Sequence, residues 1–324
     1  MAYPVGASAG AWYGGVAPNP AYSGTFIAEI WSGKLVEKFY SATVLAAISN
    51  TAYEGEIRQM GDKVKIRTKP TLSISDYVAG QTLAVQRPSS NIVELDINKG
   101  KYFNAVVDDV QEVQADIDML SMWADDASEQ MKIVIDTAVL HDTTGMGTAA
   151  GLHANNYGLT AGRISANINL GTTGAPLSLV ARAPSGAQVE ILDLIVNLGQ
   201  VLDEQNMPET GRWIIVPAWA CSLLKRSELR DASLTNDGVS VLRNGRLGMI
   251  DRFTLYSSNL LPVNTGATAI YAGHSHGLTF ASQLTKMETL RAESTFGTLM
   301  RGLQVYGYKV IDGTAIAKAY AVRA

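Results

Sequence analysis

Apolar residues recur at alternating spacings of three and four positions from Asp108 to Leu140. This spacing places their side chains on one face of an α-helix. Asp108 can cap the start of such a helix, and Gly145 and Gly147 follow its end. At 1.5 Å per residue the helix would be about 50 Å long, which exceeds the usual helix of a compact domain. The apolar run consists of Val110, Val113, Ile117, Leu120, Ala124, Ala127, Met131, Val134 and Ala138.

The apolar face of this stretch is broad, because Met119, Trp123 and Ile133 extend it beyond a narrow seam. A coiled coil has a narrower seam with charged flanking positions. We therefore predict a spine helix over 108–140 that lies along a sheet, with other elements packed against it. An ordinary long core helix is the alternative.

The composition indicates a folded protein with a weakly charged surface. Of 324 residues, 47% are apolar and 17% are charged, and 26 basic against 30 acidic side chains give a net charge of −4. No run of Lys or Arg exceeds two residues, so the sequence shows no groove for nucleic acid. Such a surface can still lie beside packed DNA without binding it tightly. The length suggests about two domains.

Three sequence features argue against an oxidising compartment, a membrane span and a secretion signal. Cys221 is the only cysteine, so no intramolecular disulfide can form and a reducing compartment is expected. No window approaches about 18 uninterrupted apolar residues, which argues against a membrane span. No basic residue precedes Lys34, so the N-terminus lacks the basic region of a secretion signal.

The first 25 residues carry no charge and few large apolar side chains. This composition fits an arm that lies along another surface, and disorder is the alternative. A helical pattern follows from Ile27 to Ile48, where apolar residues are interleaved with Glu29, Lys34 and Glu37.

Two alternating stretches, Lys63–Arg67 and Val93–Ile97, predict a two-stranded antiparallel ribbon. The polar face of the first strand is basic and that of the second is acidic, so opposite charges would lie across from one another. A ribbon of this kind is only marginally stable alone, and the segment between its strands is long for a loop within a domain. We therefore expect its apolar face and the loop residues 72–85 to lie on a neighbouring subunit. A ribbon folded back on its own domain is the alternative. The predicted interface residues are Lys63, Lys65, Arg67, Leu72, Ile74, Tyr77, Glu94 and Asp96.

The second half of the chain mixes helices and strands without regular alternation, which predicts an α+β fold. Ser185 and Gln188 have the spacing of a capping box for a helix that ends near Met207-Pro208. Its expected buried residues are Val189, Leu192, Val196, Gly199 and Leu202. Strands are expected at 163–170, 213–216, 253–256 and 269–272, a helix from 217 to 225, a short helical stretch near Phe280, and β-structure from Met287 onward.

No motif supports an active site. Ser275, within Gly273–Gly277, has the spacing of a hydrolase nucleophile elbow, but the only histidine after it is His276, which is too close to act as a base delivered by a distant loop. No Cys, Asp or Glu lies near His274 and His276 in sequence to complete a metal site. Cys221 lies among apolar residues and is interpreted as a small buried filler. We expect no enzyme activity, no cofactor and no metal.

The stretch from Pro184 to Pro262 resembles the major capsid proteins of tailed double-stranded DNA bacteriophages with the Hong Kong 97-type fold. The matching blocks are Leu202–Pro208, Gly211–Pro217, Leu242–Gly248 and Phe253–Pro262. One departure is Asp251-Arg252, where a glycine would be expected.

The resemblance implies a domain organisation for the whole chain. It has an N-terminal arm (1–25), the start of a peripheral domain (26–61), an extended loop (62–98), the peripheral domain with its spine helix (99–183), an axial domain (184–285) and returning peripheral strands (286–324).

The resemblance also implies a function and partners. The chain would self-assemble as hexamers and pentamers into an icosahedral shell that encloses double-stranded DNA without specific binding. A separate scaffolding protein and a portal are implied, a decoration protein is possible, and no membrane is involved. The location would be the virion, with assembly in the host cytoplasm. The alternatives are an encapsulin-type nanocompartment shell and, third, a serine hydrolase using Ser275.

Overall fold

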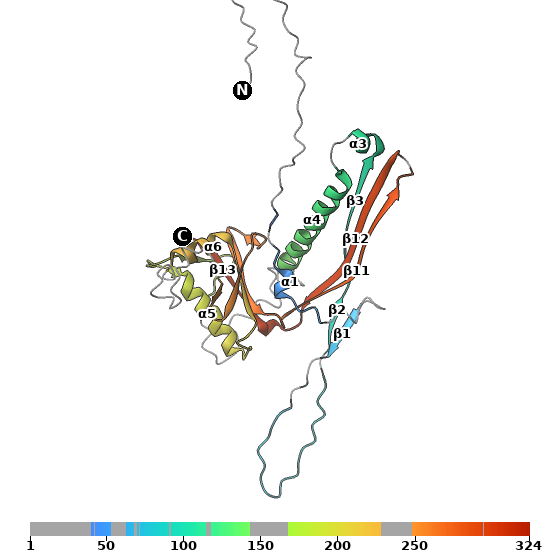
Figure 1. Ribbon diagram of the computed structural model, residues 1–324. Coiled ribbons are helices and arrows are strands. Elements are labelled where there is room, and N and C mark those ends of the chain that lie inside the picture. The colour runs from blue at the N-terminus through green and yellow to red at the C-terminus, as the bar shows by residue number, and fades with distance from the viewer. Residues whose placement is uncertain are drawn as a thin grey trace, which may run out of the picture. The chain divides into compact units, whose positions relative to one another are not determined.

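The computed structural model describes residues 40–52, 63–67, 70–114, 118–142, 168–227 and 248–324, except for single positions 42, 71, 91 and 294. By internal contacts the chain divides into residues 1–38 and 39–324, and all described residues belong to the second unit. Predictions for residues 1–39, 143–167 and 228–247, including the arm, lie outside the described residues. Figure 1 shows the arrangement of the elements.

A large mixed sheet forms the centre of the second half of the chain. Its interior strands read as continuous apolar runs because both faces are covered. In β6, for example, Ile214 packs on one side and Trp213 on the other. The strand order is β5 (Gln188–Glu190), β4 (Leu177–Val180), β13 (Ile316–Arg323), β10 (Ala267–His274), β6 (Arg212–Val216), β8 (Phe253–Ser257) and β7 (Met249–Ile250), with β9 (Val263–Asn264) paired to β10.

Two helices cover one face of this sheet, α5 (Ile191–Glu204) and α6 (Ala218–Arg226). The apolar residues of α5 recur with helical spacing, and they are buried against the sheet. These buried residues are Ile191, Leu194, Ile195, Leu198, Gly199, Val201 and Leu202. The predicted strands at 213–216, 253–256 and 269–272 are confirmed, as is the helix that follows Pro217.

The prediction that Ser185 and Gln188 form a capping box at the start of a helix was wrong. Ser185 and Gln188 do bond to each other, through the Ser185 amide and hydroxyl to Gln188 Oε1, each at 3.1 Å. They close a turn before strand β5, and the helix begins three residues later. Of the residues expected on the buried face, Gly199 and Leu202 are buried, whereas Val196 is 55% exposed.

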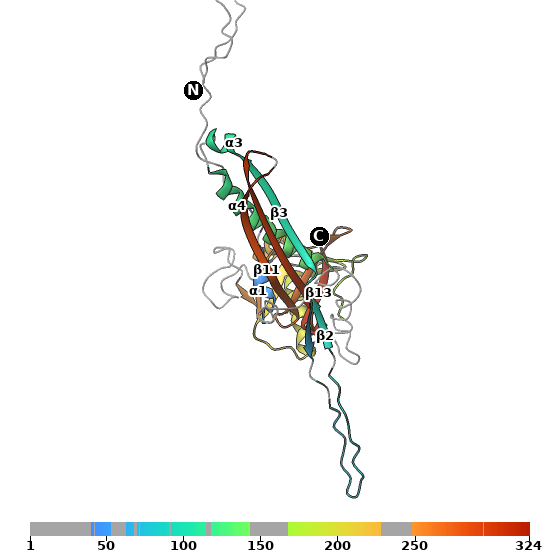
Figure 2. The same cartoon turned by 90° about the vertical axis from the view of Figure 1, so that its right-hand side faces the viewer.

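A separate three-stranded sheet has the order β11 (Leu278–Arg291), β12 (Gly297–Val310), β3 (Lys99–Asp108). Helix α4 (Met119–His141) lies beside β3 and β12 in both views (Figure 1, Figure 2). The chain enters this sheet from β10 through a turn at 275–277. The helical stretch expected near Phe280 was therefore wrong, since Phe280 lies in β11.

The spine helix predicted over 108–140 is not one continuous helix. Asp108 ends strand β3, a short helix α3 (Asp109–Gln114) follows, and α4 begins at Met119. Asp118 has extended backbone angles, and its side chain accepts a hydrogen bond from the Ser121 amide at 3.2 Å. An aspartate can cap a new helix in this way, and the apolar period carries no sign of the restart.

The N-terminal helix predicted from 27 to 48 is, within its described part, only α1 (Leu45–Ile48). The chain after α1 joins the start of β11, where the Asn50 amide donates to the Leu278 carbonyl at 2.8 Å. Val44 and Ile48 are buried against α4 and the large sheet, so this short segment is fixed at a junction of three elements.

The final segment is divided between the two sheets. β12 pairs with β3, whereas β13 crosses back through a 3₁₀ turn (Gly313–Ala315) into the large sheet. There it pairs antiparallel with β10 and parallel with β4.

Candidate functional site

The hairpin formed by β1 (Lys63–Arg67) and β2 (Ile92–Asp96) is the predicted ribbon, antiparallel and in the expected register. Lys63 lies 3.3 Å from Asp96 and 3.9 Å from Glu94, and Lys65 lies 3.5 Å from Glu94. The pairing predicted for these lysines is confirmed. Arg67 was grouped with them, but its cross-strand partner is Ile92. The charged side chains are about half exposed, so their attraction is strongly screened by water.

The apolar face of this hairpin base is covered by its own chain. Leu95 is fully buried and Ile66 is 7% exposed, and both pack with Ala281 of β11 and Val305 of β12. Lys309 Nζ also donates to the Glu94 carbonyl at 2.8 Å. The prediction that this face lies on a neighbouring subunit was therefore wrong, and the alternative, a ribbon folded back on its own domain, holds for the base.

One glycine permits this close approach. A Cβ atom on Gly307 would lie 2.3 Å from the Asp96 carbonyl oxygen and 3.0 Å from Ile97 Cα. Both are backbone atoms, so they cannot yield as a flexible side chain would. The absence of a side chain at this position lets the hairpin base rest directly on β12.

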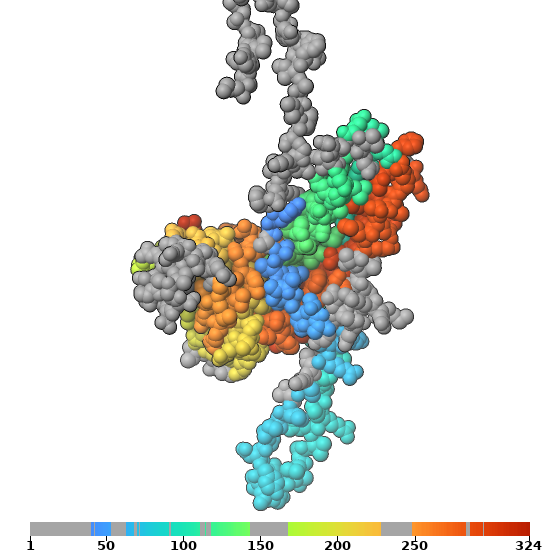
Figure 3. All heavy atoms as spheres, viewed as in Figure 1, coloured from blue at the N-terminus to red at the C-terminus, as the bar shows by residue number. Residues whose placement is uncertain are grey.

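The tip of the hairpin, residues 70–90, contrasts with the base because it projects into solvent (Figure 3). Its described residues form no strand, yet the bonds between its two arms follow the register of the base. Gln86 spans the two arms, accepting from the Ser73 amide at 3.2 Å and donating to the Ser73 carbonyl at 2.8 Å. The end closes with a bond from the Gln81 amide to the Val78 carbonyl at 3.0 Å. Gly80, at φ +83, supplies the positive angle that a type II turn needs.

Large apolar side chains are exposed along this tip. Ile74 is 93% exposed and Val85 is 88% exposed, and the two lie opposite each other in this register. Exposed apolar side chains gathered in this way mark an interaction surface or an aggregation hazard. The set is Leu72, Ile74, Tyr77, Val78, Leu83 and Val85.

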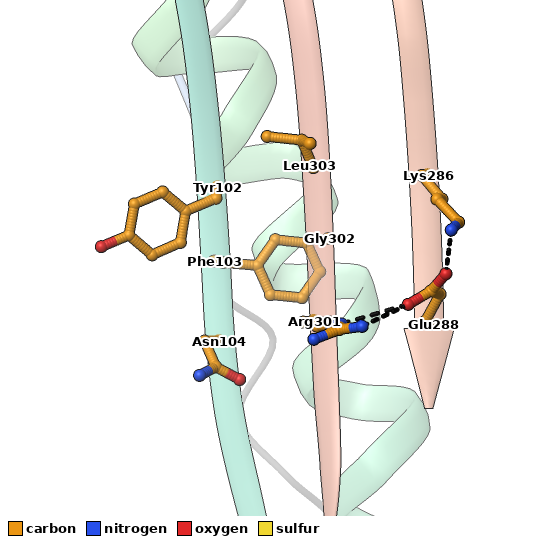
Figure 4. Close-up of a pocket in the computed structure, with 8 residues that line it drawn as sticks. All are labelled: Tyr102, Phe103, Asn104, Lys286, Glu288, Arg301, Gly302 and Leu303. Carbon is orange, nitrogen blue, oxygen red and sulfur yellow. Dashed lines mark hydrogen bonds and ion pairs between the residues drawn. The ribbon is translucent and has the colours of Figure 1, made fainter. Parts of the chain in front are cut away.

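The three-stranded sheet carries a second exposed surface, on which a hollow of about 360 Å³ opens (Figure 4). Glu288 lies between two cations there, Lys286 and Arg301, with Arg301 Nη2 2.8 Å from its carboxylate. Hydrogen bonds from these cations hold the pKa of Glu288 below its ordinary value. The ring of Phe103 lies over Gly302, and Tyr102 is 79% exposed. These groups can form an ion pair and a contact surface.

The departure at Asp251-Arg252 has a clear structural role. Both residues have positive φ, 46° and 65°, and they form the two-residue turn between β7 and β8. Arg252 compensates for the unusual backbone by pairing with Asp203 at 2.8 Å and Glu209 at 3.0 Å. Arg212, whose side chain is fully buried, also lies 2.7 Å from Asp203. Partial burial raises the pKa of Asp203, but hydrogen bonds from both arginines outweigh it, so the pKa lies below its ordinary value.

The residues tested for catalysis are not assembled into a site. Ser275 lies in a turn between two strands, whereas a nucleophile elbow joins a strand to a helix. His274 Nδ1 accepts from the His276 amide at 3.1 Å, and burial lowers the pKa of His274. Cys221 is buried, and burial raises the pKa of its thiol. Within the described ranges, no group of three His, Cys, Asp or Glu side chains could hold a metal ion.

Sequence reasoning missed Asp136, which is 1% exposed in the second half of α4. Its Oδ2 accepts from the Val44 amide at 2.7 Å. An aspartate among Ile135, Val139 and Leu140 breaks the apolar pattern, and that break was the available signal. Among the helices in the described part of the chain, none is long and apolar enough to cross a membrane.

The fold matches a family of viral shell proteins. The family described as "Phage capsid protein" matches residues 93–319, and the chain belongs to this family. A search of curated proteins gives no match. The protein is a structural component of a phage capsid shell, and so of the virion, and not an enzyme.

Solved structures agree on the fold. One from Mycobacterium phage Che8 is 26% identical, with a TM-score of 0.70, over 91% of this chain and 97% of that one. The "Capsid structure of the Cyanophage P-SCSP1u" is 16% identical, with a TM-score of 0.67, over 92% and 94%. The "Asymmetric unit of bacteriophage PhiM1 mature capsid" is 13% identical, with a TM-score of 0.63, over 94% and 96%.

Proposed function

We propose that this chain is a major capsid protein with the Hong Kong 97-type organisation, and that it self-assembles as hexamers and pentamers into an icosahedral shell. In this proposal the hairpin 62–98 is the extended loop, α4 the spine helix, and the large sheet with α5 and α6 the axial domain. A separate scaffolding protein and a portal take part in assembly, which occurs in the host cytoplasm. The capsid family and the similarity to capsid structures support the proposal.

The observation that carries the proposed contact between subunits is the exposed apolar tip of the hairpin. Side chains alternate between the two faces of an extended arm. In the register of the base, Leu72, Ile74 and Val78 therefore fall on the face of the buried Ile66, and Leu83 and Val85 join them from the other arm. The base is covered by its own chain, but the tip is not. A second copy of the chain supplies the missing cover, and a standard interface buries about 800 Å² on each partner.

The test of this contact is deletion of Leu72–Val85 in the full chain. The deleted subunit should remain folded, because the base keeps its contacts with β11 and β12. It should fail to form shells when mixed with its scaffold under conditions in which the unaltered chain assembles. Circular dichroism, protease resistance and negative-stain microscopy measure the two properties. Normal shells from the deleted chain would refute the proposed contact, and an unfolded subunit would place the tip in its own core.

A matched pair of double substitutions sharpens the test. Ile74→Asn with Val85→Asn makes the apolar face polar, whereas Thr82→Asn with Ala84→Asn changes the opposite face at the same depth. Only the first pair should reduce the yield of shells. Equal losses from both pairs would show that the face does not matter.

The proposal also covers the packaged double-stranded DNA, which the shell encloses without specific binding. The net charge of −4 and the short basic runs support this, because phosphate binding requires clustered cations. Isolated subunits should bind duplex DNA weakly at physiological salt. Nanomolar affinity that falls steeply with salt would contradict this part.

A further inference from the structure

The buried carboxylate of Asp136 joins two segments that are far apart in sequence. It lies in α4, and its Oδ2 accepts the Val44 amide, 92 residues earlier, at 2.7 Å. The amide of Leu45 also bonds to it. Its other oxygen, Oδ1, is buried and has no hydrogen-bond partner among the described residues. A buried carboxylate with an unsatisfied oxygen is costly when ionised.

The carboxylate borders a cavity of about 320 Å³ between α1, α4, β11 and β12. Among the described residues of its lining, Lys132, one helical turn before Asp136, is the only other ionisable side chain. Lys132 is paired with Glu129 at 2.5 Å. The remaining lining residues are uncharged, and they are Thr43, Leu45, Ala46, Ser49, Thr51, Ile135, Phe280 and Gln304. Among the described residues that line the cavity, no cation is paired with Asp136.

The contact at Asp136 holds one end of a short segment whose other end is attached separately. The segment 43–50 is held at one end by Asp136 and at the other by the pairing of Asn50 with β11. Tyr40, just before it, donates to Asp126 of α4 at 2.8 Å. Release at Asp136 would free the start of α1 from α4 while leaving the attachment to β11 intact.

We propose that Asp136 is a protonation-controlled latch between α4 and the start of α1. The neutral acid keeps the segment closed on α4, and the ionised carboxylate loosens it. The latch is independent of how the subunits contact one another in the shell.

The direction of the pH effect follows from the burial. Burial raises the pKa of Asp136 from 3.8 to about 6, although the amides of Val44 and Leu45 oppose this. In the open segment, where water reaches the carboxylate, the pKa returns toward its ordinary value. Protonation therefore favours the closed state, fully below about pH 4, and this contribution is lost as pH rises through about 6. The opening constant should rise on the order of 10- to 100-fold between pH 4 and pH 8, because each pKa unit corresponds to a factor of ten.

Amide hydrogen exchange of the full chain tests the latch. The opening constant of peptides covering 43–49 is measured from pH 4 to 8, after division by the intrinsic exchange rate. The unaltered chain should show the rise, and Asp136→Asn, which cannot ionise but keeps a carbonyl acceptor, should be flat. Asp125→Asn is the matched control, an exposed carboxylate of the same helix, and it should retain the rise.

Two results would overturn the proposal. An opening constant that does not change with pH in the unaltered chain would overturn the proposal by itself, even if Asp136→Asn does not fold. A rise of equal size in Asp136→Asn would assign the pH dependence to another group.

Discussion

The base and the tip of the hairpin share one register and one alternating pattern, but they differ in what covers them. At the base, Leu95 and Ile66 are buried against β11 and β12 of the same chain. At the tip, Ile74 and Val85 are almost fully exposed. The same alternating pattern therefore stabilises the subunit at the base, where its own sheet covers the apolar face. At the tip, beyond the sheet, the apolar face is free to contact a partner.

The difference depends on backbone contacts as well as on apolar side chains. The base approaches β12 closely at Gly307 and receives a hydrogen bond from Lys309. The arms of the tip are joined through the side chain of Gln86 and the turn at Gly80. The tip consequently has a defined register and little support from the rest of its own subunit.

The largest effect on the free energy of unfolding is expected when a buried side chain of the base is truncated, in contrast to an exposed side chain of the tip. Leu95→Ala removes a fully buried side chain, so the free energy of unfolding should fall by about 2–5 kcal/mol. Ile74→Ala, at a position that is 93% exposed, should change it by less than about 0.5 kcal/mol. Urea denaturation of the unassembled subunit measures both. Similar losses from both variants would show that the tip belongs to the folded core.

A smaller effect should come from the glycine that lets the base approach β12. Gly307→Ala places a methyl group 2.3 Å from the Asp96 carbonyl oxygen, so the hairpin must shift, at a cost of about 1–3 kcal/mol. Gly100→Ala in the same sheet is the control, because its nearest neighbour would be the Gln304 carbonyl oxygen at 3.9 Å. That variant should be unchanged or slightly more stable. Thermal denaturation distinguishes the two, and an equal loss at both positions would mean that the close contact is not responsible.

The sequence predicted this hairpin well because its signals are local. Alternation determines which side chains share a face, and the charges on Lys63, Lys65, Glu94 and Asp96 restrict the register. Which residues cover each face depends on parts of the chain that are far away in sequence. Nothing in the sequence at Ala281 and Val305 indicates that they cover the hairpin base. The buried base was assigned to a neighbour for that reason.

The errors elsewhere have the same origin. The break before α4 depends on the capping geometry of Asp118, and a continuous apolar period conceals it. The path of β13 into the large sheet depends on β10 and β4, which are far away in sequence. Asp136 was visible only as a charge within an apolar run, and its partner is an amide, which no side-chain pattern can indicate.

The smallest expected effect concerns the ion pairs of the base. Glu94→Gln removes attractions to Lys63 at 3.9 Å and Lys65 at 3.5 Å, and all three side chains are about half exposed. Exposed pairs contribute about 0–1 kcal/mol each, so losing two should lower the free energy of unfolding by no more than about 2 kcal/mol in low salt. At about 1 M salt, where charges are screened within about 3 Å, the difference should disappear. Asp76→Asn makes the same charge change at the tip and should have no effect on unfolding at either salt concentration. Urea denaturation at both concentrations measures this, and a loss above about 2 kcal/mol that persists in high salt would mean that Glu94 stabilises the base through something other than its cross-strand lysines.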